Sequence, residues 1–437
     1  MAMREHLADV PLAEVDRVLS GLWGRATSGG EEGSTFRMRG LNLVVLCFAG
    51  TSVEPVIHTL RELSGRSPAR MILVTEEAGS RALASKGSTA KADPPESAEP
   101  RERTPFQDPT DGEDPAESRD PTVQAHILFE CGGESTDRVH ACFELVQIDA
   151  QRKDMEQIEG LLAPVLIVGL PTVVWVPRGD EGVLRVLKAV ADAVDHIITD
   201  SAGFPDPVTG VVELQRLTEV LPGRVVLSDL SWTRLTPWRE MIAELFEVRE
   251  RRSMLGRIER VLVTYGSEAT MPGAGYADWR PAAARSLLLV AWLASRLGWQ
   301  PRPEGWAVEG DALVTRFDRL GGRSDGGTLR VELQPHRCRP GTFGGVESVT
   351  LEIARSSSGE EEAVLTFTRS PESGVCAARV RRSGADDQVR TLEVPLPGEA
   401  DLLSEELSYH GRDGVFREAL AMAAGLAALS GSAGLGE

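Results

Sequence analysis

Short, continuously apolar runs alternate with stretches of helical periodicity through the first half of the chain. Residues 41–48 form one apolar run and residues 70–75 form another, which is typical of strands buried on both faces. Residues 11–25, and the segment between the two runs up to about residue 63, place apolar side chains at helical spacing. A strand, a helix and a strand in this order predict a parallel βαβ unit.

The same alternation resumes after residue 121 and continues to about residue 250. The predicted fold of residues 1–250 is therefore an α/β domain with a mostly parallel sheet covered by helices. Further strands are predicted at 123–130, 139–148, 170–176, 196–199 and 224–227, and further helices at 155–163, 181–194, 213–221 and 237–248. In the last of these helices, Trp238, Ile242, Leu245 and Phe246 fall on one face.

The second half of the chain, residues 251–437, has a different pattern. One strong helix is predicted at 280–297, and it is followed by apolar and polar residues in alternation, with connections short enough for antiparallel hairpins. We therefore predict an α+β domain with an antiparallel sheet and two closing helices. The strands are predicted at 258–265, 312–317, 328–333, 348–353, 363–368, 375–380 and 389–394, and the closing helices at 399–409 and 414–429.

Residues 79–121 interrupt the first domain with a composition unlike the rest. They hold seven prolines, ten acidic residues and one aromatic residue. Such a segment cannot bury enough apolar surface to offset the loss of chain entropy. We interpret it as a disordered surface insertion, because strand patterns resume after it.

Charge and hydropathy exclude some classes of partner. The 437 residues carry a net charge of −19, with 66 acidic residues against 47 basic ones. Phosphate backbones and anionic membranes repel such a chain, so neither a nucleic acid nor a membrane is expected as partner. No apolar run reaches the ~18 residues that span a bilayer, and residues 1–10 lack a signal-peptide core. The sequence therefore predicts a cytoplasmic protein.

Motifs that hold nucleotides or metals are missing from the sequence. There is no Gly-x-x-x-x-Gly-Lys-Ser/Thr loop, no Gly-x-Gly-x-x-Gly turn between a strand and a helix, and no Cys-x-x-Cys pair. Asp200 and Ser201 follow a predicted strand, where α/β proteins often place their sites, but Ser201 lacks a Gly-x-Ser-x-Gly elbow. Capping of a turn by Asp200 or Ser201 is the favoured interpretation. No cofactor, metal or catalytic residue is predicted.

Two of the five cysteines fall where a hairpin would bring them together. Cys131 and Cys142 flank a predicted turn between two strands, so a reversible disulfide is one interpretation. A pair of ordinary thiols is the favoured one for a cytoplasmic protein. Cys47 lies within an apolar run, and we expect it to be inert and buried.

Residues 228–240 form the densest unusual segment. They contain two tryptophans and two arginines beside a helix start, at which Thr236 is the expected N-cap and Pro237 the first helical residue. Tryptophan and arginine dominate protein–protein hot spots, which makes Trp232, Arg234 and Arg239 candidate partner-binding residues. The alternative is that the tryptophans are core residues. We expect Trp238 to be core, because it shares the apolar helix face.

The same segment carries a resemblance to a known family. Asp-Leu-Ser-Trp-Thr-Arg-Leu-Thr-Pro-Trp-Arg at 229–239 resembles the hallmark of the glucose-6-phosphate dehydrogenase assembly protein (OpcA) family. Further matches follow in the family's order at 67–70, 164–175, 197–201 and 288–299. The chain departs from the family pattern at Gly169, before Leu-Pro, and at Val176, after Trp175, and it carries the long insertion.

The resemblance implies a function that the composition does not. Members of the family promote the assembly or activity of glucose-6-phosphate dehydrogenase, the first enzyme of the oxidative pentose phosphate pathway. In cyanobacteria the family is linked to redox control through thioredoxin. No catalytic residues are described for it. The resemblance therefore implies a non-catalytic assembly factor or allosteric activator whose partner is glucose-6-phosphate dehydrogenase, with thioredoxin as a second partner. The candidate redox residues are the two hairpin cysteines, Cys131 and Cys142.

The sequence is also compatible with two other functions. One is a small-molecule sensor or degenerate enzyme that binds a sugar phosphate or nucleotide in an α/β-domain pocket near Asp200 and Ser201. The other is a structural subunit without a regulatory role. A ligand that binds the folded chain raises its melting temperature, which separates the sensor from the activator.

Overall fold

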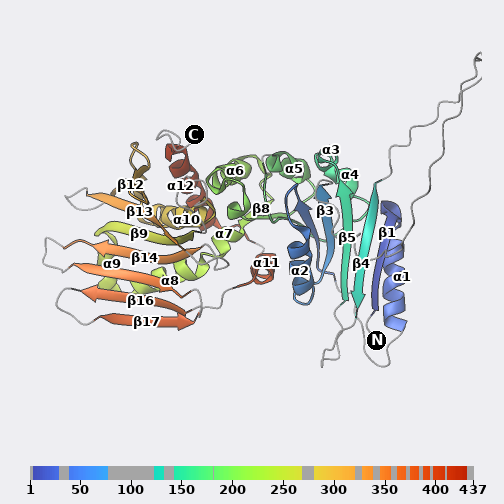
Figure 1. Cartoon of the computed structure of the whole chain (residues 1–437), viewed down its shortest axis with the longest axis horizontal. Coiled ribbons are helices and arrows are strands. Elements are labelled where there is room, and N and C mark those ends of the chain that lie inside the picture. Colours follow the sequence, from blue (N-terminus) through green and yellow to red (C-terminus); the bar gives the residue numbers. More distant parts are fainter. Residues whose placement is uncertain are drawn as a thin grey trace, which may run out of the picture.

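The computed structural model describes thirteen segments of the chain and contains two β-sheets (Figure 1). The insertion predicted at 79–121 lies outside the described residues, so its predicted disorder stays a prediction. The described segments are 3–28, 39–76, 123–131, 142–180, 182–267, 280–319, 327–337, 345–355, 362–370, 375–382, 387–393, 397–408 and 411–430.

The first sheet, called sheet A, has eight strands in the order β1-β4-β5-β3-β2-β6-β7-β8. Its six strands from β5 to β8 run parallel, and β1 and β4 add antiparallel pairs at one end. The predicted mostly parallel sheet with helices is thus confirmed. The strands are β1 (Met3–Pro11), β2 (Leu41–Cys47), β3 (Ala69–Glu76), β4 (Gln124–Cys131), β5 (Cys142–Ala150), β6 (Thr172–Val176), β7 (His196–Thr199) and β8 (Val226–Asp229).

The parallel strands follow the order of a doubly wound sheet. Numbered among themselves along the chain, β2, β3, β5, β6, β7 and β8 take the spatial order 3-2-1-4-5-6. The chain therefore winds first in one direction from β2 and then in the other from β6. The point where the order reverses lies between β2 and β6, and folds of this kind bind their ligands outside the carboxyl ends of the strands there.

Both faces of sheet A are buried, which is why its strands are apolar without alternation. Val44 and Leu46 of β2 contact one hydrophobic core, and Leu43 and Val45 contact another, because successive side chains point to opposite faces. The first core includes side chains of α1 (Val15–Ser28), α4 (Ile158–Leu162), α5 (Val183–Val190) and α6 (Pro207–Val220). The second includes α2 (Val53–Ser64) and, from the far end of the chain, α11 (Glu399–Ser408).

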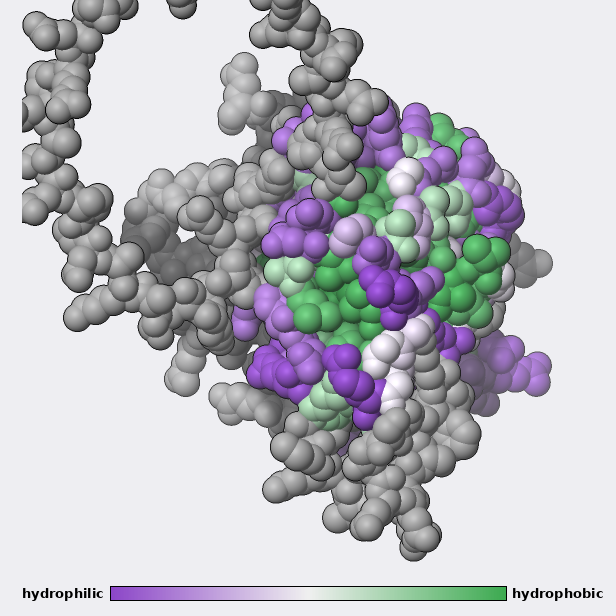
Figure 2. All heavy atoms as spheres, turned by 90° about the vertical axis from the view of Figure 1, so that its right-hand side faces the viewer, coloured by the Kyte–Doolittle hydropathy of each residue, from purple (hydrophilic) through white to green (hydrophobic). Residues whose placement is uncertain are grey.

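Strand β1, which the sequence patterns did not predict, forms the outer edge of sheet A. Figure 2 shows this end of the molecule, where hydrophobic side chains lie between hydrophilic ones. Arg4 and His6 of β1 are exposed, and Arg4 pairs with Glu130 of β4. Charged side chains of this kind keep an edge strand from pairing with another chain.

The second sheet, sheet B, has nine strands and is mixed. Its order is β10-β12-β13-β9-β14-β15-β16-β17, with β11 paired to β12. The predicted antiparallel pairing holds for most neighbours, but β9 and β13 run parallel. The strands are β9 (Ile258–Ser267), β10 (Trp299–Pro301), β11 (Ala307–Glu309), β12 (Ala312–Arg319), β13 (Thr328–Arg337), β14 (Val346–Ile353), β15 (Ala363–Arg369), β16 (Val375–Arg382) and β17 (Gln388–Glu393).

The last helices connect the two halves of the molecule (Figure 1). Helix α10 (Arg280–Leu297) packs on sheet B, and α12 (Gly414–Ser430) packs on both α10 and α6. Helix α11 packs on α2 and α7 (Leu230–Thr233). The last strand of sheet A, β8, and the first strand of sheet B, β9, are separated in the chain by α8 (Thr236–Glu247) and α9 (Arg249–Leu255). A domain boundary near residue 250 remains our proposal, with α11 and α12 reaching back across it.

Candidate functional site

The family-like motif at 229–239 begins with a capping carboxylate. Asp229 is the last residue of β8 and the N-cap of α7, where its Oδ1 accepts the main-chain N–H of Ser231 at 2.9 Å. The same oxygen accepts the main-chain N–H of Ser201 at 2.9 Å, from the end of the neighbouring strand β7. Both Asp229 and Ser201 are fully buried. This carboxylate therefore fixes two strand ends and one helix start.

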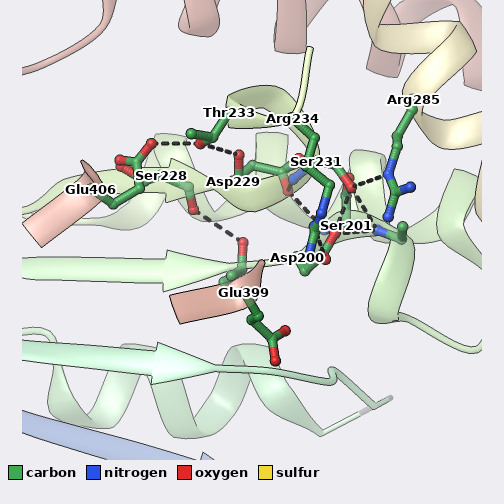
Figure 3. Close-up of polar contacts among 12 residues, drawn as sticks. Asp200, Ser201, Ser228, Asp229, Ser231, Thr233, Arg234, Arg285, Glu399 and Glu406 are labelled. Atoms are coloured by element: carbon green, nitrogen blue, oxygen red, sulfur yellow. Dashed lines mark hydrogen bonds and ion pairs between the residues drawn. The ribbon is translucent and has the colours of Figure 1, made fainter. Parts of the chain in front are cut away.

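Asp200 is a second buried carboxylate beside the first. It caps the short 3-10 helix Ser201–Gly203 by accepting the N–H of Ala202 at 3.1 Å, which confirms the predicted turn cap. It also accepts the hydroxyl of Ser231 and forms an ion pair with Arg234. Two residues of the motif thus bind Asp200 rather than project into solvent (Figure 3).

Arg285 brings the second half of the chain into this group. It lies on α10, and its Nε is 3.5 Å from the Ser231 hydroxyl oxygen. Figure 3 shows its guanidinium approaching from the side opposite Arg234. Together these side chains, which we call the polar cluster, join the carboxyl ends of β7 and β8 to α7 and α10. The polar cluster consists of Asp200, Ser201, Asp229, Ser231, Arg234 and Arg285.

The two carboxyl groups of the polar cluster have different electrostatic environments. Burial, together with the charge of the neighbouring Asp200, raises the pKa of Asp229 to about 7. Burial also acts on Asp200, but the charges of Arg234 and Arg285 and the hydrogen bond from Ser231 outweigh it and hold its pKa below the usual value. Burial lowers the pKa of Arg285. Asp200 is therefore the ionised partner of the arginines, and Asp229 is the group that takes up a proton near neutral pH.

The polar cluster does not assemble a serine nucleophile in the described part of the chain. The hydroxyl of Ser201 is buried and has no hydrogen-bond partner there, and neither has Oδ2 of Asp229. The histidine on the same strand, His196, places its Nε2 2.8 Å from the Ser228 hydroxyl instead. Nucleophilic catalysis needs a base within hydrogen-bond reach of the nucleophile. The geometry supports a structural cluster, in line with the predicted turn cap.

Trp232, the first tryptophan of the motif, holds the last helix of the chain. Its indole Nε1 donates to Asp413 at 2.8 Å, and its ring lies 5.6 Å from the ring of Phe416 on α12, centroid to centroid. On its other side, the guanidinium carbon of Arg239 lies 3.6 Å from the Trp232 ring centroid. Trp232 is 4% exposed. The motif is therefore an internal attachment point for α12.

A cavity of about 430 Å³ lies where the motif meets α11 and α12. Burial lowers the pKa of Arg239, which lines this cavity, to about 10, against the opposing effect of Asp413 and nearby glutamates. Burial and the neighbouring Glu406 raise the pKa of Glu405. Thr233 donates its hydroxyl to Glu406 and so ties α7 to α11. The lining is mostly polar or acidic: Leu227, Ser228, Asp229, Trp232, Thr233, Thr236, Arg239, Glu405, Glu406, Ser408, Gly411, Asp413 and Phe416.

The candidate partner-binding residues are thus drawn into contacts within the chain. Trp232 is buried against α12, and the side chain of Arg234 is 22% exposed and paired with Asp200. Arg239 stacks on Trp232 and faces the cavity. Trp238 is 2% exposed, which confirms that it is core. Thr236 is the first residue of α8 rather than its cap, since Leu235 takes the N-cap position. Partner binding by the motif remains a prediction. Arg239 is its strongest candidate residue, because it faces the cavity.

The residues that complete the site come from distant parts of the chain and were not predicted from the sequence. Arg285, Glu406 and Asp413 contact the motif from positions 54 to 181 residues further along the chain. Spacing patterns report neighbours on one element, so they carry no signal for contacts at this separation. The available clue was the presence of arginines in the motif. A guanidinium that the fold buries needs a carboxylate partner, so acidic residues from elsewhere in the chain were to be expected beside them.

Arg70, from another family-like stretch, is also internal. It is fully buried on β3, where its Nε donates to Glu144 at 3.1 Å and its Nη1 to the carbonyl of Val165 at 2.8 Å. Its Nη2 donates to Asp16 of α1 at 2.6 Å. These bonds attach α1 to sheet A, so this part of the motif set is structural.

Cys131 and Cys142 face each other across the β4–β5 hairpin. Their Cα atoms are 4.3 Å apart, and the structure joins their sulfur atoms in a disulfide. This differs from the favoured expectation of ordinary thiols, because strand register placed the two residues directly opposite each other. Cys47 is buried as expected, and burial raises the pKa of its thiol to about 12.

Within the residues that the structure describes, no group of three or more His, Cys, Asp or Glu side chains is arranged to hold a metal ion. None of the described helices is both long and apolar enough to cross a membrane.

Comparisons with known proteins agree on one family. Residues 60–216 match the model described as the N-terminal domain of a glucose-6-phosphate dehydrogenase subunit, and residues 225–420 match the corresponding C-terminal domain. An OxPP cycle protein OpcA from Nostoc punctiforme is 28% identical over 291 residues, and one from Synechococcus elongatus is 27% identical over 289. Each match covers 65% of this chain but only 57% and 59% of the respective relatives.

Similar solved structures include two sugar dehydrogenases. A levoglucosan dehydrogenase aligns with a TM-score of 0.48 and 14% identity, over 91% of this chain and 97% of the other. Glucose-6-phosphate 1-dehydrogenase from Mycobacterium avium aligns with a TM-score of 0.48 and 11% identity, over 89% and 90%.

This is a two-sheet protein with a doubly wound first half, whose buried polar cluster attaches the second half to the carboxyl ends of β7 and β8. Within that class, the two family models place the chain plainly: it belongs to the OpcA family of glucose-6-phosphate dehydrogenase assembly proteins.

Proposed function

We propose that this chain binds glucose-6-phosphate dehydrogenase and promotes its active form without catalysing the reaction itself. The observation that carries the proposal is the match of two dehydrogenase-subunit family models, in order, over residues 60–216 and 225–420. The geometry of the polar cluster is compatible with a non-catalytic role, because its charged groups pair with one another. We place this role in the cytoplasm, in accord with the sequence.

Activation of this kind has a thermodynamic requirement. A non-catalytic protein shifts an enzyme between two states only by binding one of them more tightly than the other. A hundredfold difference in affinity corresponds to ~2.7 kcal/mol and takes an active state from about one tenth to about nine tenths of the population. The chain must therefore present a surface that fits the active oligomer or the high-affinity conformation of the dehydrogenase.

Size-exclusion chromatography with light scattering tests the binding step. The cognate dehydrogenase is run alone, with the full chain, and with the Arg239→Ala variant. We expect a complex with the wild-type chain at micromolar concentrations. If Arg239 contacts the partner, its variant should bind about thirtyfold more weakly, the effect of a ~2 kcal/mol hot spot.

The Arg216→Ala variant is the matched control for that binding assay. Arg216 lies on α6 in an exposed ion pair with Glu213, so its removal should leave complex formation unchanged. Separate elution of wild-type chain and dehydrogenase across this concentration range would refute the binding proposal. Normal binding by a folded Arg239→Ala variant would refute only the role of the motif.

Redox control is a second proposal, favoured by the position of Cys131 and Cys142 opposite each other on adjacent strands. A dithiol reductase such as thioredoxin would reduce this disulfide by thiol–disulfide exchange, with its own two thiols oxidised in return. Oxidised and reduced chain should then differ in activating power, while the Cys131→Ser, Cys142→Ser variant should not respond to reductant. Equal activation by both forms of the wild-type chain would remove this proposal.

A further inference from the structure

The strand order of sheet A points to a crevice that the sequence patterns did not locate. Proteins with the order 3-2-1-4-5-6 bind a dinucleotide at the switch point, here between β2 and β6. Their first turn has the form Gly-x-Gly-x-x-Gly. The corresponding residues here are Phe48-Ala-Gly-Thr-Ser-Val53, which keep only the middle glycine, Gly50, with its φ of +83°. Phe48 and Val53 are buried where the fingerprint needs no side chain.

A carboxylate of the chain itself binds the main-chain amide of this turn. The N–H of Ala49 donates to Oε2 of Glu76 at 2.8 Å. Glu76 is the last residue of β3, the strand whose end carries the ribose-binding acid in dinucleotide-binding sheets. In those sheets the turn amides face the pyrophosphate. Here the acid turns back onto the amide, so a protein anion takes the position of the ligand anion.

Arg152 completes the arrangement, which we call the clasp and define as Phe48, Glu76, Arg152 and Asp180. Arg152 opens α3 (Arg152–Met155) just after β5, and it donates to the two Glu76 oxygens at 3.0 and 2.9 Å. Its Nη1 donates to Asp180, which follows β6, at 3.2 Å. Its guanidinium carbon lies 4.9 Å from the Phe48 ring centroid. The clasp thus joins the segments that follow β2, β3, β5 and β6, on both sides of the switch point.

The charge of the clasp is unfavourable for a dinucleotide. Two carboxylates face one guanidinium, which leaves an excess negative charge where a pyrophosphate would lie. The hydrogen bond to Asp180 is the largest of the effects that raise the pKa of Arg152, and the charges of Asp180 and Glu76 add to it. The donors of Arg152 are therefore engaged by the chain.

We infer that the clasp occupies the crevice in place of a dinucleotide, so that this doubly wound domain holds its own loops together and takes no nicotinamide cofactor. The residues present do not fit the cofactor that the strand order implies: two glycines of the fingerprint are missing, the turn amide is bound to Glu76, and the net charge is negative. The inference concerns this chain alone and is independent of any dehydrogenase partner.

Thermal unfolding of the full chain with nicotinamide cofactors tests the first half of the inference. NAD⁺, NADH, NADP⁺ and NADPH are each titrated to about 2 mM, because a ligand at a hundred times its Kd stabilises a folded protein measurably. We expect the melting temperature to stay constant. A saturable rise with any of the four would overturn the inference, and this measurement needs no variant.

Substitution of Arg152 tests the second half. Arg152→Ala leaves Glu76 and Asp180 facing each other unneutralised, so we expect the melting temperature to fall by roughly 1–3 °C. The matched control is again Arg216→Ala, in which the exposed pair with Glu213 is lost. An Arg152→Lys variant keeps the charge but cannot bridge two carboxylates with a planar fork, so its melting temperature should be intermediate. Equal melting temperatures for Arg152→Ala and the control would show that the clasp does not stabilise the fold.

Discussion

The clasp and the polar cluster lie at the same edge of sheet A but differ in burial. Both use side chains at or just beyond the carboxyl ends of parallel strands, the edge where this fold usually binds ligands. The charged side chains of the clasp are 14–33% exposed, whereas Asp200 and Asp229 of the polar cluster are buried. The clasp joins loops of one half, and the polar cluster joins both halves.

The carboxyl edge of sheet A is thus stabilised by two kinds of polar contact. Partly exposed ion pairs contribute little each, because water screens them, whereas breaking a buried pair leaves an uncompensated charge. The polar cluster should therefore control global stability, and the clasp should control the local order of the crevice.

Trp232 should contribute most to the attachment of the second half. Trp232→Ala removes a buried ring that contacts Phe416 and Arg239, so we expect a loss of ~3–5 kcal/mol in the free energy of unfolding, measured by urea titration. Trp232→Phe keeps a ring but loses the bond to Asp413, and it should cost about 1–3 kcal/mol. A Trp232→Ala chain as stable as wild type would contradict the internal role of the motif.

Arg234 should come next. Arg234→Ala leaves the buried Asp200 with Arg285 as its remaining cation, and we expect a loss of about 3 kcal/mol. Denaturant titration of this variant beside Arg152→Ala compares the two regions directly. If both arginine substitutions had equal effects, burial would not be what distinguishes the polar cluster from the clasp.

The disulfide lies at the opposite edge of sheet A, away from both groups. Cys131→Ser combined with Cys142→Ser should cost about 2 kcal/mol under oxidising conditions, since the link closes a short loop. Wild-type chain in reductant should lose the same amount and then match the variant. The measurement is thermal unfolding with and without dithiothreitol, and a wild-type melting temperature that ignores reductant would contradict a formed disulfide.

Asp229 should give stability a pH dependence of a defined sign. Its pKa is about 7 in the folded chain, whereas the usual pKa of an aspartate is 3.8, so between these pH values the folded state holds a proton that the unfolded state has lost. This group therefore contributes stability that falls as pH rises from about 4 to 7. An Asp229→Asn variant should gain melting temperature relative to wild type between pH 5 and pH 8. A constant difference over that range would contradict the shifted pKa.

Removal of residues 79–121 should have the smallest effect. The segment starts three residues after Glu76 of the clasp, yet its composition is that of a solvated coil, and loop-closure entropy grows slowly with length. With a short Gly/Ser linker in its place, the melting temperature should stay within a few degrees of wild type. A large drop would mean that the segment supports sheet A.

Local features of the fold were predictable, and pairings across the chain were not. The apolar runs located the central strands of sheet A, and the shared apolar face of α8 correctly made Trp238 a core residue. Strand β1 was not predicted, because its exposed charged side chains obscure the alternation of apolar and polar residues that indicates a strand. The roles of Trp232 and Arg234 depend on Asp413 and Asp200, which are 181 and 34 residues away. No periodicity reports such contacts.

We propose that the chain activates glucose-6-phosphate dehydrogenase without catalysis of its own. Initial rates of the cognate dehydrogenase, measured over glucose-6-phosphate concentration at several ratios of chain to enzyme, test it most directly. We expect no activity from the chain alone, and a lower KM or a higher kcat for the enzyme that saturates as the chain is added. Identical kinetic constants with and without saturating chain, at several enzyme concentrations, would contradict the claim.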